Sequence, residues 1–173
     1  MWRIAKLGII SIVLFFCLIT IISLFIPSRI RISKAINLAA QNDSILNPVR
    51  DIEAWKKWYP GFDTIPVISL EKNGEQIIKA KVPGAEIVLN EYNDSIVNAS
   101  FIADNKRPVQ QTWRRITYPA ADSITLQWYT EFKLRWYPWE KFSSLMFEGR
   151  YGGQMEKGLE NLKKLIQNHS SNN

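Results

Sequence analysis

The sequence predicts an α+β fold in which a curved antiparallel sheet is covered by one long C-terminal helix and preceded by one transmembrane helix. Three observations support this prediction. Residues Leu7 to Ile26 carry no charge, strand-like segments follow one another from Pro66 to Trp136, and an apolar stripe of helical spacing lies between Gln154 and Gln167. We therefore divide the chain into an N-terminal transmembrane anchor (1–27), one domain (28–168) and a polar tail (169–173).

The uncharged run near the N-terminus is long enough to cross a bilayer. At about 1.5 Å of rise per residue, a helix over this run spans roughly 30 Å, the thickness of the hydrocarbon core. Arg3 and Lys6 precede the run, as in a signal peptide, but the exit from Ser23 to Arg29 lacks the small residues of a cleavage site. We favour an uncleaved signal anchor, with a cleaved signal peptide as the alternative.

The distribution of basic residues does not determine on which side of the membrane the domain lies, because basic residues flank the run at both ends. The segment before the run is too short to be a domain and is expected to stay inside. This arrangement predicts a single-pass membrane protein whose domain lies outside the cytoplasm. The lipid bilayer is thus an expected partner through residues 7–26, and protein partners are not predicted.

Charge and cysteine content exclude other classes of protein. The formal charge is +6, and without Arg3 and Lys6 the chain keeps 20 basic against 16 acidic residues, spread along its length. A nucleic-acid binder would gather its basic residues into a patch or stripe, so no nucleic-acid partner is expected. Cys17 is the single cysteine and lies in the uncharged run, which leaves the domain without a disulfide or a thiol nucleophile.

The domain is expected to begin with a strand and two short helices. Apolar and polar residues alternate from Arg29 to Ile36, as in a strand with one buried face. From Asn37 to Trp58 the apolar spacing lengthens to that of a helix. Pro48 interrupts it, where it ends one short helix and begins another, and Tyr59–Pro60–Gly61 closes the pair with a turn.

About six further strands follow, separated by short turns that suit hairpins. The segments are Val67–Glu71, Gln76–Val82, Ala85–Tyr92, Ile96–Ala103, Val109–Tyr118 and Ser123–Trp136. The last segment alternates most clearly: its even positions are apolar except Thr130, and Glu131 belongs to the outward, polar set. Consecutive strands joined in this way form a meander with one apolar face.

The C-terminal helix supplies the cover that this apolar face needs. Its stripe consists of Met155, Leu159, Leu162 and Ile166. A short segment, Trp139 to Phe147, precedes it. Three glycines between Gly149 and Gly153 are expected where the backbone bends or approaches another element closely.

The two ends of the domain resemble a known superfamily. The segments that carry the resemblance are Asn37–Leu38–Ala39–Ala40, the W-x-x-W-x-P motif within Ile52–Pro60, Trp128, Trp139–Phe142 and Gly153–Lys163. They resemble membrane-anchored bacterial members of the START-like, Bet v 1-like superfamily (SRPBCC), often labelled polyketide cyclase/dehydrase and lipid transport. The resemblance implies a helix-grip fold with a cavity between sheet and helix for hydrophobic ligands. It also implies a bacterial cytoplasmic membrane as the location, and that a minority of members are catalytic.

Few residues are available for catalysis. His169 is the only histidine and lies in the tail, which leaves no histidine-based relay or histidine metal cluster. The carboxylates considered are Glu53, Glu86, Glu91 and Glu131, and none has another acid at a telling spacing. We predict no catalytic residue, no metal site and no cofactor.

Aromatic residues are the better candidates for a ligand cavity. The predicted lining residues are Trp55, Trp58, Trp113, Trp128, Phe132, Tyr151 and Met155. For Trp55 and Trp128 core packing is the favoured alternative, whereas Tyr151 and Met155 are the better pocket candidates. The segment Arg135–Lys141 mixes aromatic and basic residues, as membrane-interface segments do, but ordinary packing at the rim of the domain is favoured there.

The expected function is therefore that of a membrane-tethered domain that binds or carries a hydrophobic small molecule or lipid without catalysis. Two alternatives remain open. One is an enzyme of cyclase or dehydratase type that uses a cavity carboxylate, and the other is a ligand-free interaction module of the cell envelope.

Overall fold

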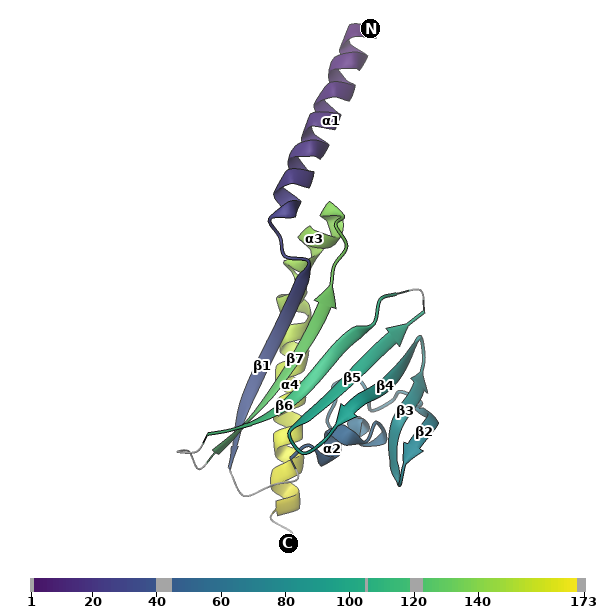
Figure 1. Cartoon of the computed structure of the whole chain (residues 1–173), viewed down its shortest axis with the longest axis vertical. Coiled ribbons are helices and arrows are strands. Elements are labelled where there is room, and N and C mark those ends of the chain that lie inside the picture. Colours follow the sequence, from purple (N-terminus) through teal and green to yellow (C-terminus); the bar gives the residue numbers. More distant parts are fainter. Residues whose placement is uncertain (1, 40–44, 105, 119–122, 171–173) are drawn as a thin grey trace.

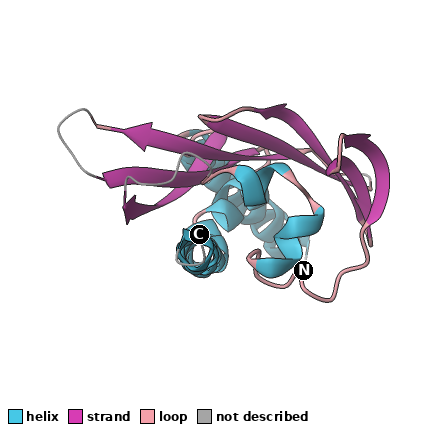
Figure 2. Ribbon diagram, turned by 90° about the horizontal axis from the view of Figure 1, so that it is seen from below, coloured by secondary structure: helices cyan, strands magenta, loops and turns pink. Residues whose placement is uncertain are grey.

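One curved sheet of seven antiparallel strands, with helices against one of its faces, makes up the domain, and a single helix projects from it (Figures 1 and 2). The computed structural model describes residues 2–39, 45–104, 106–118 and 123–170. In chain order the elements are α1 (Trp2–Leu24), β1 (Arg29–Ala39), α2 (Asn47–Arg50), η1 (Glu53–Lys57), β2 (Ile68–Asn73), β3 (Gln76–Val82), β4 (Ala85–Tyr92), β5 (Ile96–Ala103), β6 (Val109–Thr117), β7 (Ser123–Lys133), α3 (Pro138–Ser144) and α4 (Phe147–Ser170). The α+β helix-grip prediction is confirmed.

The helix α1 stands apart from the core of the domain. Its side chains are exposed along its length, with Ser23 as the buried exception. Among the described residues, α1 is the one helix that is both long enough and apolar enough to cross a membrane, a property that a signal sequence shares. The helix is thus not a core element, and its length and composition fit either of the two expectations for residues 1–27.

The sheet order is β1-β7-β6-β5-β4-β3-β2. Strands β2 to β7 form the predicted meander, and β1 pairs with β7 along its whole length, from Arg29 opposite Lys133 to Ala39 opposite Ser123. The turn between β2 and β3 contains Gly74 (φ 60°), and the turn between β3 and β4 contains Gly84 (φ 77°). Both positive φ angles require glycine. The hairpins predicted at these two positions are present.

The last strand is shorter than predicted. The sequence indicated a strand to Trp136, but β7 ends at Lys133 and the Trp136 side chain is 62% exposed. The neighbouring strands explain this end, because the pairing with β6 stops at Glu131 and β1 begins opposite Lys133. Beyond Lys133 the Leu134 N–H still donates to the carbonyl oxygen of Ser28 (2.8 Å), outside the strand ladder.

Two short helices follow β1, as predicted, but Pro48 begins the first of them, α2, instead of separating the two, and the break before η1 lies at Asp51. The Asp51 carboxylate between them accepts hydrogen bonds from the backbone N–H groups of Glu53 (3.1 Å) and Ile77 (3.0 Å), which joins the helices to β3. The strand before them is longer than predicted, since β1 includes Asn37 to Ala39. Leu38 explains this extension, because it is buried on the inner face of the sheet.

The long helix α4 covers the inner face (Figure 2). Its predicted stripe is confirmed, since Met155, Leu159, Leu162 and Ile166 are all buried. The glycines were expected at a bend or at a close approach, and the structure shows the close approach. The helix α4 begins at Phe147 and continues without a bend through Gly149 to Gly153, and a Cβ atom on Gly152 would lie 3.1 Å from Lys34 Cε. The helix ends at Ser170, so it extends into the predicted tail, whose residues 171–173 and the side chain of His169 lie outside the described part of the chain.

Candidate functional site

A pocket lies between the N-terminal part of α4 and the inner face of the sheet. Its volume is about 210 Å³. The lining residues are Tyr59, Phe101, Val109, Gln111, Trp128, Thr130, Phe132, Tyr151, Gln154 and Met155. Most are aromatic or aliphatic and none carries a charge, so the chemistry of the pocket suits an apolar molecule with few polar groups.

The periods of strand and helix bring these side chains together. On β7, Trp128, Thr130 and Phe132 occupy alternate positions and so share the face that α4 covers. On α4, Tyr151 and Met155 are four residues apart and lie on one side of the helix. The rings of Phe132 and Tyr151 have centroids 5.1 Å apart, so the strand wall and the helix wall meet there.

The structure places four of the seven predicted cavity residues on the pocket wall and three behind it. Those on the wall are Trp128, Phe132, Tyr151 and Met155. Those behind it are Trp55, Trp58 and Trp113, each at most 1% exposed. Trp128 belongs to both regions, because its ring lies 5.9 Å from that of Trp58 and 5.3 Å from that of Trp113, measured between centroids.

The two tryptophans of the W-x-x-W motif attach the short helices to the sheet. The indole N–H of Trp55 donates to the carbonyl oxygen of Val49 (2.8 Å), and that of Trp58 donates to the carbonyl oxygen of Pro48 (3.0 Å). Both rings are buried among other aromatic rings, and their polar atoms are satisfied by the backbone of α2. Core packing therefore accounts for both residues.

A glutamine forms the polar centre of the pocket. The side-chain amide of Gln111 donates to the Tyr59 hydroxyl (3.0 Å), and its carbonyl oxygen accepts a hydrogen bond from the Trp128 indole (3.2 Å). Burial raises the pKa of Tyr59 to about 12, although the hydrogen bond with Gln111 opposes the shift. The Tyr59 hydroxyl is therefore neutral at physiological pH, and Thr130 adds a second uncharged hydroxyl to the lining.

Charged groups attach the first turns of α4 to the edge strand β1. The Lys34 ammonium contacts the carboxylates of Glu148 (2.7 Å) and Glu156 (2.8 Å), whose hydrogen bonds raise the pKa of Lys34 above its ordinary value. Gly152 provides the space, because a Cβ atom there would lie 3.1 Å from Lys34 Cε. This group, which we call the Lys34 strap, adds ion pairs to the aromatic contacts that Phe147 and Tyr151 make with Phe132.

Below the pocket the helix approaches the sheet much more closely. A Cβ atom on Gly158 would lie 2.6 Å from Cζ3 of Trp128 and 3.1 Å from Cδ of Pro60. Real Cβ contacts are essentially never that short, so only glycine allows α4 to contact Trp128 at this distance. Gly158 thus fixes the position of the ring that forms the pocket's floor.

The carboxylates considered from the sequence lie outside the pocket. Glu131 faces outward, as predicted, and pairs with Arg31 on the neighbouring strand. The acids paired or bonded elsewhere are Glu53 with Lys56, Glu86 with Lys79 and Glu91 with Asn98. In the part of the chain that the structure describes, no group of three potential ligands is arranged to hold a metal ion.

A second depression lies on the opposite face of the sheet and has a different character. It has a volume of about 360 Å³, and its lining is largely amide, hydroxyl and carboxylate groups. The residues are Asn90, Asn98, Ala99, Ser100, Gln110, Thr112, Tyr129 and Glu131. Several of these side chains bond to one another, for example Thr112 to Asn98 (2.6 Å) and Asn90 to Ser100 (2.6 Å), so the apolar pocket is the better candidate site.

Sequence reasoning did not identify six of the lining residues. They are Tyr59, Phe101, Val109, Gln111, Thr130 and Gln154. For two of them the sequence held a signal: Thr130 is the single polar residue in the apolar row of the last strand, and Gln111 is a polar residue two positions before the buried Trp113. A polar side chain in a buried row needs a partner or a ligand.

This arrangement of sheet, short helices and C-terminal helix is a helix-grip fold, as the resemblance implied. No family model matches the sequence, and no curated protein matches it either. The fold is thus assigned from the structure.

Solved structures share this fold at low sequence identity. A START superfamily protein from Mycobacterium smegmatis is 16% identical with a TM-score of 0.55, covering 80% of this chain and 97% of its own. Norcoclaurine synthase from Thalictrum flavum, in complex with a transition-state analogue, is 14% identical with a TM-score of 0.57, covering 82% and 96%. A hypothetical protein from Helicobacter pylori is 14% identical with a TM-score of 0.54, covering 79% and 87%.

Proposed function

We propose that this protein binds a small, apolar molecule in the pocket between α4 and the sheet, and that α1 tethers the domain to a membrane. The pocket carries the proposal: it is lined by aromatic and aliphatic side chains and has one polar centre at Gln111. That combination is typical of sites that bury a ligand and orient it by a few hydrogen bonds.

The size of the pocket defines the class of ligand. Its volume of about 210 Å³ lies below the range of roughly 300–1,000 Å³ for drug-sized molecules. A small aromatic compound or part of one acyl chain suits it better than a lipid with two chains. The neutral Tyr59 hydroxyl and the Thr130 hydroxyl can bond to a polar head of such a ligand.

The residues that line the pocket support binding without catalysis. A cyclase or dehydratase of the predicted kind needs a carboxylate in the cavity, and no aspartate or glutamate lines this pocket among the described residues. The likeness to norcoclaurine synthase is a likeness of fold at 14% identity, and the polar residues of the pocket are suited to orienting a molecule.

Native mass spectrometry of the full chain, released from detergent, tests the binding proposal. The wild-type protein is expected to carry a small apolar molecule that organic solvent extracts. Thr130→Leu fills the pocket from β7 and should remove this molecule, whereas Thr117→Leu, on the exposed end of β6, should retain it. A wild-type protein that never carries a ligand, even after incubation with millimolar indole, would favour the interaction-module alternative.

The tether is tested by the mass of the same protein. An intact N-terminal segment and resistance to extraction from membranes at alkaline pH support an anchor formed by residues 7–26. A mature chain that lacks residues 1–27 identifies a cleaved signal peptide instead. The predicted location of the domain, outside the bacterial cytoplasmic membrane, is tested by whether added protease reaches it in intact cells.

A further inference from the structure

The short helix α3 buries polar side chains and exposes apolar ones, which is the reverse of a helix on the surface of a soluble domain. The side chains that it buries are Pro138, Lys141 and Ser144. The large apolar side chains that it and its flanks expose are Trp136 (62%), Trp139 (62%), Phe142 (37%), Leu145 (65%) and Met146 (75%). We call this set the α3 surface. The expectation that aromatic residues here pack at the rim of the domain is wrong, because the two tryptophans face away from it.

Burial of a lysine holds α3 in this orientation. The Lys141 ammonium donates to the carbonyl oxygen of Ile26 (2.5 Å) and to the hydroxyl of Ser28 (2.9 Å), both in the connection between α1 and β1. The Ser144 hydroxyl bonds back to the Lys141 carbonyl oxygen (2.6 Å). The polar side of α3 makes these contacts with the domain. Its apolar side therefore faces away from them and is not covered by the domain.

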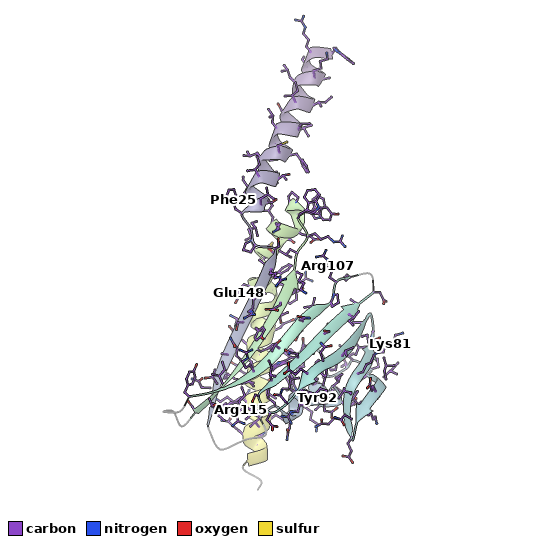
Figure 3. The ribbon with its side chains drawn as sticks, in the orientation of Figure 1. Phe25, Lys81, Tyr92, Arg107, Arg115 and Glu148 are labelled. Atoms are coloured by element: carbon purple, nitrogen blue, oxygen red, sulfur yellow. The ribbon has the colours of Figure 1, made fainter. Side chains whose placement is uncertain are left out.

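The position of the α3 surface identifies what covers it. Lys141 is bonded to Ile26, which is the last residue of the uncharged run, so α3 lies where α1 would leave the hydrocarbon layer. Phe25 at the same level is 84% exposed. Figures 1 and 3 show α3 at the foot of α1, with side chains projecting beside the labelled Phe25.

The composition of this end of the domain matches a lipid headgroup layer. Tryptophan and tyrosine are enriched at that depth, and the Tyr137 ring stacks on Trp139 with centroids 4.8 Å apart. Four exposed basic residues lie in the neighbouring segments, namely Arg29, Lys133, Arg135 and Arg150. Of these, Arg135 is partly engaged by Glu140 (3.9 Å), and the net basic character favours anionic lipids.

We infer that the α3 surface is a second membrane contact, inserted into the headgroup region of the same leaflet that α1 leaves. The inference rests on the proposed anchor and deepens it. It also places the pocket, because the pocket residue Phe132 packs against Phe147, directly after α3, with ring centroids 4.8 Å apart. The wall formed by β7 and the start of α4 is thereby held at the lipid surface, where an apolar ligand can pass from the leaflet to the protein.

Fluorescence quenching in nanodiscs tests this inference on the full chain. In a Cys17→Ser background, Leu145→Cys is labelled with the environment-sensitive dye NBD. Leu70→Cys is the matched control, because Leu70 is exposed and belongs to β2, a strand that lies far from α1 (Figure 1). With phosphatidylcholine and phosphatidylglycerol, lipids spin-labelled at the headgroup should quench the dye at position 145 and shift its emission to the blue. The dye at position 70 should show neither effect.

The native cysteine separates the two proposals. A dye on Cys17, in the middle of the run 7–26, should be quenched by lipids spin-labelled deep in the acyl chain if the anchor spans the bilayer. Deep quenching at position 17 with an unquenched dye at position 145 overturns the inference and leaves the anchor in place. A blue-shifted but unquenched dye at position 145 indicates that a second copy of the chain covers the surface and also overturns it. Absence of quenching at both positions overturns both proposals.

Discussion

The two halves of α4 contact the sheet differently. The C-terminal half is closely packed: Leu159 and Leu162 are at most 1% exposed, and Gly158, near the midpoint, contacts Trp128. The N-terminal half borders the pocket and combines the aromatic contacts of Phe147 and Tyr151 with Phe132 and the ion pairs of the Lys34 strap. The comparison shows that close packing and open space are separated along one helix, with Trp128 at the boundary.

The free energy of folding is expected to be concentrated in the packed half. Each fully buried leucine contributes about 1.5–3 kcal/mol relative to an exposed one, and the tryptophans of the core add aromatic contacts of about 0.5–1.5 kcal/mol per pair. The exposed ion pairs of the Lys34 strap contribute less, because water screens them. Stability in one half thus allows the other half to keep a cavity.

The largest test of this difference removes one aromatic ring from the packed core and one from the pocket wall. Trp55→Ala is expected to lower the free energy of unfolding by about 3–5 kcal/mol, because Trp55 is fully buried and packs against Trp58, Phe62 and Trp113. Phe132→Ala, on the half-buried pocket wall, should cost clearly less. Urea unfolding of the full chain in detergent, followed by circular dichroism, measures both changes, and equal losses would contradict the comparison.

A matched pair of glycine substitutions on α4 comes next in size. Gly158→Ala is expected to destabilise the protein by about 1–3 kcal/mol, since the new methyl group clashes with Trp128 and Pro60. Gly153→Ala, with no neighbour within 4 Å, should instead stabilise the helix by up to about 1 kcal/mol. The same urea unfolding experiment compares them, and Gly158→Ala should also weaken binding in the pocket because it displaces Trp128.

The smallest effect is confined to alkaline pH. The pKa of Tyr59 is raised by burial to about 12 in the folded protein, whereas the ordinary value is about 10. The unfolded chain therefore loses the Tyr59 proton first, and stability should decrease as pH rises from about 10 to 12. Unfolding of Tyr59→Phe should show a smaller decrease over this range, and identical pH profiles for the two proteins would show that Tyr59 is not shielded from water.

The sequence was sufficient for the elements that a regular period defines. Alternation located the strands, and the stripe from Met155 to Ile166 located the packed face of α4. Contacts between segments distant in sequence were not accessible in this way. Gly158 looks like any polar-side position until Trp128 is known to lie against it. The glycines at 149–153 indicated a bend or a close approach, but the sequence did not show that Lys34 is the residue that approaches Gly152.

The pocket was predicted only in part for the same reason. Tyr151 and Met155 were identified from their position at the start of the terminal helix, but Phe101 and Val109 reach the pocket only through the order of the strands. The orientation of α3 was also hidden, because the bonds of Lys141 to Ile26 and Ser28 join residues more than one hundred positions apart. Periodicity identifies a helix of this length poorly and does not reveal a buried lysine.

The connection between α1 and β1 has a mechanical consequence. Only residues 25–28 separate the two elements, and the Lys141 ammonium grips two of them. A connection this short, bonded at two of its four residues, restricts how far the domain can rotate relative to α1. Because β1 also carries Lys34, a change in the tilt of α1 would reach the first turns of α4, and the pocket opening beside them, through a single strand.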